Sequence, residues 1–147
     1  MRINYPAVAA SAVAYWLLGA LWYSPLLFAG PFIALKGYSP EQLAAMQTQG
    51  HAGEIGLAFL TSLVLAYVLA HFVKFTGAET ATSGALTGFW LWLGFVVTTN
   101  LETVIFEARP LGLYLINNGY HLVGLLGMGA LLAVWRRERT RVPAYQS

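Results

Sequence analysis

The 147-residue sequence has no cysteine and very few charged residues. The lack of cysteine excludes disulfide bonds, thiolate metal sites and cysteine nucleophiles. Charged residues make up only 10% of the chain, whereas soluble domains contain about 25%. Together with 58% hydrophobic residues and a mean hydropathy of +0.61, this scarcity of charge excludes both a soluble globular domain and an intrinsically disordered chain.

Charges are absent from four long stretches of the sequence. These stretches contain 33, 19, 22 and 26 uncharged residues, and they separate Arg2 from Lys36, Glu54 from Lys74, Glu79 from Glu102, and Arg109 from Arg136. A helix needs about 17–25 residues to cross the hydrocarbon core of a bilayer. The sequence therefore predicts an all-α, polytopic membrane protein with four transmembrane helices in a bundle.

Proline and capping residues set the expected limits of these helices. We predict a single transmembrane domain over residues 1–147, with spans at about 5–24, 55–75, 84–106 and 113–135, the first ended by Pro25 and the third followed by a turn at Pro110. Between the first two spans, Leu26 to Leu35 is apolar but contains Gly30 and Pro31, and is expected at the membrane interface. Ser39 as N-cap and Gln42 then form a capping box, with Pro40 in the first turn, which predicts a short amphipathic interfacial helix over about 40–48.

The basic residues predict the orientation of the protein. Four spans place both termini on one side of the membrane. That side holds Arg2, Lys74 and the four arginines of the tail 136–147, whereas the other side holds Lys36 and Arg109. Cytoplasmic segments are enriched in lysine and arginine. We therefore predict an inner-membrane protein with both termini in the cytoplasm, and we interpret the basic tail as a topology signal rather than a nucleic-acid-binding segment.

Several polar side chains fall inside the predicted spans, where they are costly and by default mark a function or a partner. Glu102 and Asn117 each lie seven residues from the turn at Arg109–Pro110, which corresponds to a depth of about 10 Å. His121 lies one turn beyond Asn117 on the same face. We therefore hypothesise a Glu102–Arg109–Asn117–His121 network in a pocket in the outer half of the bundle. The candidate pocket residues are Tyr23, Ser24, Glu102, Glu107, Arg109, Asn117 and His121. The alternative is a satisfied hydrogen-bond network that only fixes the register between the last two spans.

Three functions remain open for this sequence. We favour a non-enzymatic binding or accessory subunit, either self-associating or part of a larger membrane complex, whose pocket holds a small molecule, a lipid headgroup or a partner helix. A small proton-coupled transporter is the second possibility, with His121 and Glu102 as the titrating pair. A membrane-embedded enzyme is the third, and Ser24, His121 and Glu102 are the residues that could converge. No cofactor, metal site, catalytic residue or nucleic-acid partner is predicted.

Glycines are concentrated in the last two predicted spans. Gly84 and Gly88 form a small-x-x-x-small pattern, which lets two helices approach closely. The fourth span adds Gly119, Gly124, Gly127 and Gly129. This pattern predicts either tight packing within the bundle or self-association.

Four segments give the chain a resemblance to a known family. They are Leu21–Pro25, Gly56–Leu60, Phe106–Pro110 and Ile116–His121. With these segments, the chain resembles the bacterial and fungal membrane family known as domain of unknown function 1761, over roughly Tyr5 to Trp135. The resemblance implies four helices and no agreed activity. It draws attention to Tyr23, Ser24, Glu107, Arg109, Asn117 and His121, whereas Glu102 is selected by its position alone.

Overall fold

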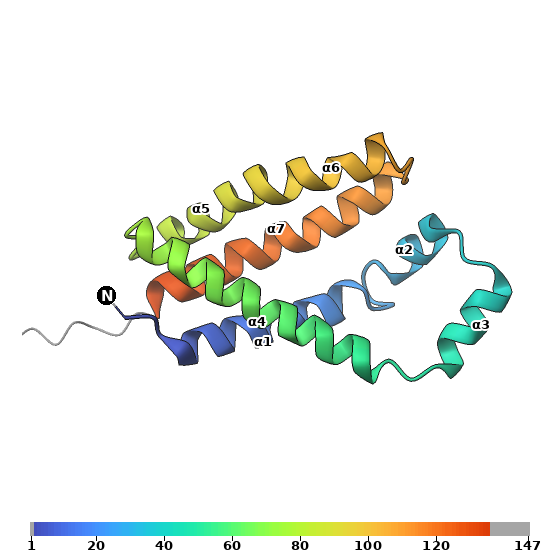
Figure 1. Cartoon of the computed structure of the whole chain (residues 1–147), viewed down its shortest axis with the longest axis horizontal. Helices are drawn as coiled ribbons and strands as arrows, with labels where there is room; N and C mark the ends of the chain where they lie inside the picture. Colours follow the sequence, from blue (N-terminus) through green and yellow to red (C-terminus); the bar gives the residue numbers. More distant parts are fainter. Residues whose placement is uncertain (1, 136–147) are drawn as a thin grey trace, which may run out of the picture.

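The computed structural model describes residues 2–135, and most of them are helical (Figure 1). The basic tail, predicted to be cytoplasmic, lies outside the described residues. The helices are α1 Tyr5–Trp22, α2 Ala29–Lys36, α3 Pro40–Thr48, α4 Ala52–Phe75, α5 Ala81–Leu91, α6 Thr98–Ile105 and α7 Leu111–Val134. A π-helix, Trp92–Val97, joins α5 to α6, so that these three elements form one continuous span.

Four spans are long and apolar enough to cross a membrane, as predicted. They are Tyr5–Trp22, Ala52–Phe75, Ala81–Ile105 and Leu111–Val134. Large apolar side chains cover much of their outward surface, including Leu17, Val64, Phe95 and Leu115, each more than half exposed. Apolar patches of this extent are rare on soluble monomers, because water does not solvate them favourably. The structure is therefore an all-α membrane bundle.

The two ends of the bundle differ. One end, called here the terminal end, holds the start of α1, the end of α7 and the link between α4 and α5 (Figure 1). The Asn4 side-chain amide donates a hydrogen bond of 2.8 Å to the Trp135 carbonyl oxygen, which joins the first and last described helices. The opposite end, called here the loop end, holds α2, α3 and the turn between α6 and α7 (Figure 1).

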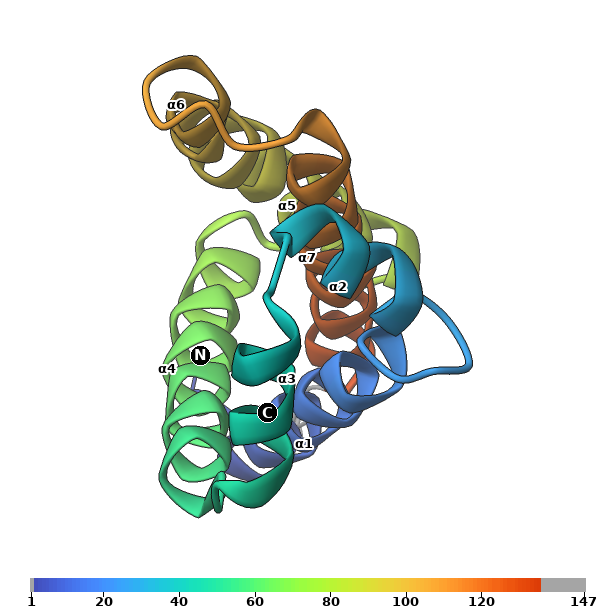
Figure 2. The ribbon, with the colours of Figure 1, turned by 90° about the vertical axis from the view of Figure 1, so that its right-hand side faces the viewer.

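Helix α7 lies at the centre of the packing (Figure 2). It contacts α5 most extensively, and it also packs against α1 and α4, which pack against each other. The core at the terminal end is apolar and includes Ala12, Leu69, Leu125, Met128 and Leu132, each less than 9% exposed. The polar side chains described below are therefore concentrated in the other half of the bundle.

The helix limits follow local signals in the sequence. The predicted capping box of α3 is confirmed, because the Gln42 N–H donates to Ser39 Oγ and the Ser39 N–H donates to Gln42 Oε1. A second capping box, between Thr80 and Ser83, begins α5 earlier than predicted. Helix α2 was not predicted from the sequence. It tolerates Pro31 because this proline lies in the first turn, where its missing N–H needs no helical partner.

Candidate functional site

A polar stripe on α7 faces its neighbours near the loop end. It consists of Tyr114, Asn117, Asn118 and His121, spaced at i, i+3, i+4 and i+7, so that all four side chains lie along one side of the helix. Asn118 is buried, and the other three are half-buried. Each makes a hydrogen bond to another helix or to the backbone, as polar groups inside a membrane bundle must.

Asn118 joins α7 to the span formed by α5, the π-helix and α6. Its Nδ2 donates to the Tyr114 carbonyl oxygen at 2.8 Å, and its Oδ1 accepts from Asn100 Nδ2 at 3.3 Å. Its own carbonyl oxygen accepts from Trp92 Nε1 at 2.9 Å. Two groups of this residue, the side-chain oxygen and the backbone carbonyl, therefore hold the third span against the fourth, whereas Nδ2 bonds within α7.

The π-helix provides an additional acceptor for this contact. A π-helix widens the turn and removes some carbonyl oxygens from the regular i→i−4 pattern, and such segments occur frequently at functional sites. Here the Tyr114 hydroxyl donates to the Val97 carbonyl oxygen, at the end of the π-helix, with a distance of 2.9 Å. The irregular segment is thus held by a side chain of the polar stripe.

Tyr15 of α1 and Tyr23, which directly follows α1, bind the other side of the stripe. The Tyr23 hydroxyl donates to Asn117 Oδ1 at 2.7 Å, and the Tyr15 hydroxyl lies 2.7 Å from His121 Nδ1. Tyr120 donates its hydroxyl proton to the Tyr15 carbonyl oxygen at 3.1 Å, and the two rings stack with their centroids 4.7 Å apart. These contacts hold the side chains of Asn117 and His121 in place from the side of α1.

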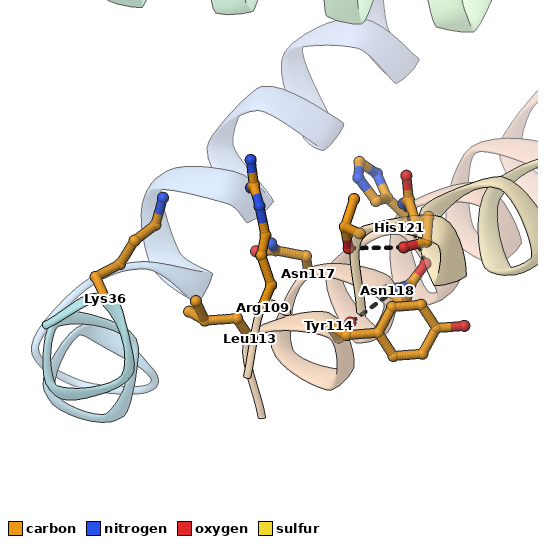
Figure 3. Close-up of a pocket in the computed structure, with 9 residues that line it drawn as sticks. Lys36, Arg109, Leu113, Tyr114, Asn117, Asn118 and His121 are labelled. Atoms are coloured by element: carbon orange, nitrogen blue, oxygen red, sulfur yellow. Dashed lines mark hydrogen bonds between the residues drawn. The ribbon is translucent and has the colours of Figure 1, made fainter. Parts of the chain in front are cut away.

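A cavity of about 210 Å³ lies beside this network and is lined by residues of α2, α6, the α6–α7 turn and α7 (Figure 3). In Figure 3 the Lys36 and Arg109 side chains extend to the same side of α7 as the His121 ring. The lining is predominantly polar. Its residues are Lys36, Asn100, Thr103, Arg109, Leu113, Tyr114, Asn117, Asn118 and His121.

Not all the candidate residues predicted from the sequence reach this cavity. Arg109, Asn117 and His121 line the cavity. Tyr23 does not line it but donates a hydrogen bond to Asn117, which does. Arg109 pairs with Glu107, with 2.7 Å between Nε and Oε2. The described lining does not include Glu102, which is exposed on α6.

Ser24 is also directed elsewhere. Its hydroxyl donates to the Leu21 carbonyl oxygen at 2.6 Å, within the turn that follows α1. The structure therefore does not bring Ser24 and Glu102 together with His121, and the triad considered from the sequence is not assembled. In residues 2–135, no group of three or more histidine, aspartate or glutamate side chains is placed to hold a metal ion.

Six lining residues are not among the seven candidates named from the sequence, namely Lys36, Asn100, Thr103, Leu113, Tyr114 and Asn118. Tyr114 and Asn118 could have been found from the helical spacing that links them to Asn117 and His121. Lys36 had no such signal, because it reaches the cavity from α2, a helix that the sequence did not predict.

A second ionisable cluster lies at the loop end, outside the spans. His51, which precedes α4, has Nδ1 2.7 Å from Glu54 Oε2 and Nε2 2.9 Å from the Met46 carbonyl oxygen. The hydrogen bond to the Met46 carbonyl oxygen has the largest effect on the pKa of His51, and the Glu54 carboxylate has the second largest. Both raise this pKa above its usual 6.5. A group whose pKa is raised by folding stabilises the fold fully below its unfolded pKa, and this contribution is lost as the pH rises through the folded pKa.

We expect the junction between α3 and α4 to be more ordered below about pH 6.5 than in alkaline solution. An NMR titration of the His51 ring should give a pKa above 6.5, and Glu54→Gln should lower it without removing the contribution of Met46. Glu41→Gln, an exposed change in the first turn of α3, is the control. Identical His51 titrations in the wild type and Glu54→Gln would contradict this assignment.

Comparison with known proteins identifies a family. The model of a family described as "Protein of unknown function (DUF1761)" matches residues 6–133. No curated protein and no solved structure matches the chain. The matched range omits only the first residue of α1 and the last residue of α7, and so covers nearly all of the four spans and every residue that lines the cavity.

Proposed function

The chain belongs to the DUF1761 family of proteins of unknown function, and on this premise we propose that it is a non-enzymatic binding protein of the membrane. Its cavity at the loop end would hold a small molecule, a lipid headgroup or a side chain of a partner helix. The observation that carries this proposal is the cavity itself, which is lined by polar side chains that hydrogen bonds hold in place across α1, α6 and α7. Preorganised polar groups around a cavity are typical of binding sites.

The hydrogen bonds favour binding over catalysis. Thr103 lines the cavity, but its hydroxyl donates to the Asn100 carbonyl oxygen at 2.7 Å rather than to a base. An activated nucleophile requires a base within hydrogen-bond reach of the hydroxyl. His121 is instead engaged by Tyr15 through Nδ1.

The packing also favours binding over transport. Below His121, α7 contributes Leu125, Met128 and Leu132 to the apolar core of the terminal end. A carrier needs a polar path that alternates between the two sides of the membrane. The cavity is at one end of the bundle, which supports a site that is loaded from that side.

We further propose that the loop end faces away from the cytoplasm, in the inner membrane. Within the described residues, Arg2 precedes α1 and Lys74 lies in the last turn of α4, at the terminal end, whereas Lys36 ends α2 and Arg109 lies in the α6–α7 turn, at the loop end. In the sequence, four more arginines follow α7, whose last residues lie at the terminal end. Because cytoplasmic segments are enriched in lysine and arginine, this excess of basic residues supports a terminal end that faces the cytoplasm. The exposed face of α6, including Glu102, is available for a second copy or another subunit.

Filling the cavity tests the proposed function. Thr103→Trp would place an indole ring in the cavity, whereas Thr99→Trp would place the same ring on the exposed side of α6. Each protein is purified from native membranes in a mild detergent, and the bound small molecules are identified by mass spectrometry. We expect the wild type and Thr99→Trp to retain a molecule that Thr103→Trp loses.

The same experiment separates this proposal from its alternatives. Equal retention in both variants would place the bound molecule outside the cavity and overturn the proposal. The absence of any molecule or partner subunit from the wild type would also count against it. Thermal unfolding of each variant shows whether a loss of ligand comes from a loss of fold.

A further inference from the structure

We propose that the loop-end cavity is an anion-binding site that recognises a carboxylate or phosphate group, an inference that rests on the binding function proposed above. Its arrangement differs from a generic polar pocket in one respect. The side chains facing the cavity from α2, the α6–α7 turn and α7 present hydrogen-bond donors and positive charge. The acceptor atoms of two of them are occupied by Tyr15 of α1 and by Tyr23, which directly follows α1.

Two exposed cations, Lys36 and Arg109, line the cavity. Lys36 is the last residue of α2, and its Nζ lies 5.4 Å from the centroid of the Phe32 ring, which restrains the side chain. Arg109 is restrained by Glu107, which binds its Nε and leaves the two terminal nitrogens free for another acceptor. No aspartate or glutamate is among the described lining residues, so these two cations give the lining its charge.

Tyr23 determines the orientation of the Asn117 amide. An asparagine side chain has one acceptor oxygen and one NH₂ group with two donors. The Tyr23 hydroxyl uses the oxygen, at 2.7 Å, from the α1 side. Because Asn117 also lines the cavity, its NH₂ group is the polar atom left to interact with a ligand.

Tyr15 has the same effect on His121. A neutral imidazole carries one proton, so one ring nitrogen donates and the other accepts. We assign the Tyr15 hydroxyl as the donor to Nδ1, because Tyr15 is buried, its O–H proton needs an acceptor, and Nδ1 lies within hydrogen-bond distance at 2.7 Å. The proton of the neutral ring then lies on Nε2. His121 therefore presents an N–H donor on the side away from Tyr15.

The backbone of α7 adds to this positive character. Leu113, the third residue of α7, lines the cavity, so the site lies at the N-terminal end of a 24-residue helix. The N-terminal end of a helix dipole carries a partial positive charge, which favours anions. Side-chain donors, two cations and the helix dipole thus all favour the same kind of ligand.

The same anionic chemistry can come from a lipid headgroup or from a free anion in water. The test therefore uses two probes with the full-length protein. Native mass spectrometry in detergent compares retention of phosphatidylglycerol with that of zwitterionic phosphatidylcholine. Isothermal titration calorimetry measures binding of inorganic phosphate. We expect either preferential retention of phosphatidylglycerol or measurable phosphate binding, and the probe that binds identifies the source.

Charge variants locate the site. Lys36→Gln and Arg109→Gln should each weaken binding of the preferred probe about tenfold, since each removes a charge-assisted hydrogen bond. Asn117→Asp should weaken it at least as much, because it places a carboxylate of almost unchanged shape in the cavity. Lys74→Gln removes the same charge at the terminal end and should leave binding unchanged. Thermal unfolding in the absence of probe verifies the fold of each variant.

Three results would overturn the anion site. They are no preference of the wild type for either anionic probe, unchanged binding in both Lys36→Gln and Arg109→Gln, or an equal loss in Lys74→Gln. With any of these results, the proposed binding function still holds if the wild type retains a neutral molecule that Thr103→Trp loses. The proposed function itself fails only if the cavity retains no molecule or partner.

Discussion

Gly88→Ala is expected to destabilise the protein by about 3 kcal/mol, because overpacking against an unyielding neighbour reaches this cost. A Cβ atom on Gly88 would lie 2.1 Å from the Leu125 carbonyl oxygen, and one on Gly84 would lie 2.1 Å from the Gly129 carbonyl oxygen. In both cases the neighbouring atom belongs to the α7 backbone and cannot rotate away. Relief requires that α5 and α7 move apart along their main contact.

The measurement is thermal unfolding in a single detergent, supported by size-exclusion chromatography. Gly127→Ala is the matched control, since Gly127 lies on α7 within the same turns but a Cβ atom added to it would meet no atom within 4 Å. This change should be neutral or stabilising by up to about 1 kcal/mol, because alanine favours helix over glycine. Similar unfolding temperatures for Gly88→Ala and Gly127→Ala would contradict the observed contact between α5 and α7.

Tyr15→Ala is the second substitution with a large expected effect. Tyr15 is 6% exposed, stacks on Tyr120, and contacts the α7 backbone where a Cβ on Gly124 would lie 2.3 Å from its ring. Its removal leaves a cavity that neighbouring side chains fill only in part. We expect a loss of about 3–5 kcal/mol, the range for truncation of a large buried aromatic residue.

Two further variants separate packing from hydrogen bonding at this position. Tyr15→Phe keeps the ring and removes only the bond to His121, and interhelical hydrogen bonds in membranes average about 0.6 kcal/mol. Tyr5→Ala, at an exposed position at the start of the same helix, should have little effect. We expect Tyr15→Ala to unfold at a lower temperature than Tyr15→Phe. Equal losses for these two changes would show that the hydroxyl, not the ring, stabilises this region.

The spans were predictable because hydrophobic length is a property of the sequence alone. A gap of at least 19 uncharged residues marks a span whatever its neighbours are, and all four spans are present. The capping box at Ser39 was equally local and is confirmed. Gly84 and Gly88 pack against α7 within the bundle, which agrees with the packing interpretation of their spacing.

The candidate site was harder to predict because it depends on which face each helix turns to its neighbours. The sequence argument placed Glu102 and Arg109, seven residues apart, in one network. In the structure α6 ends at Ile105, and Ala108 adopts a left-handed conformation with φ of 50°, so Arg109 no longer follows the helical spacing. Arg109 therefore meets Glu107 instead of Glu102.

The two asparagines of α7 illustrate the same difficulty. Consecutive residues of a helix point about 100° apart, so adjacent side chains serve different neighbours. Asn117 turns toward α1 and Asn118 toward α6, whereas the sequence argument expected Asn117 to face the third span. Depth in the membrane could be counted along the sequence, but the direction around the helix required the packing of the whole bundle.

The π-helix has a geometric consequence for the third span. Gly88 and Asn100 are twelve residues apart, and in a regular α-helix they would point about 120° away from each other. Absorbing one extra residue in the wider turn removes about 100° of this angle. Gly88 and Asn100 are thereby brought nearly into phase, and both contact α7. The π-helix therefore corrects the rotation of the third span about its own axis, as a stutter does in a coiled coil. As a result, the same face of this span contacts α7 both at Gly88 and beside the cavity.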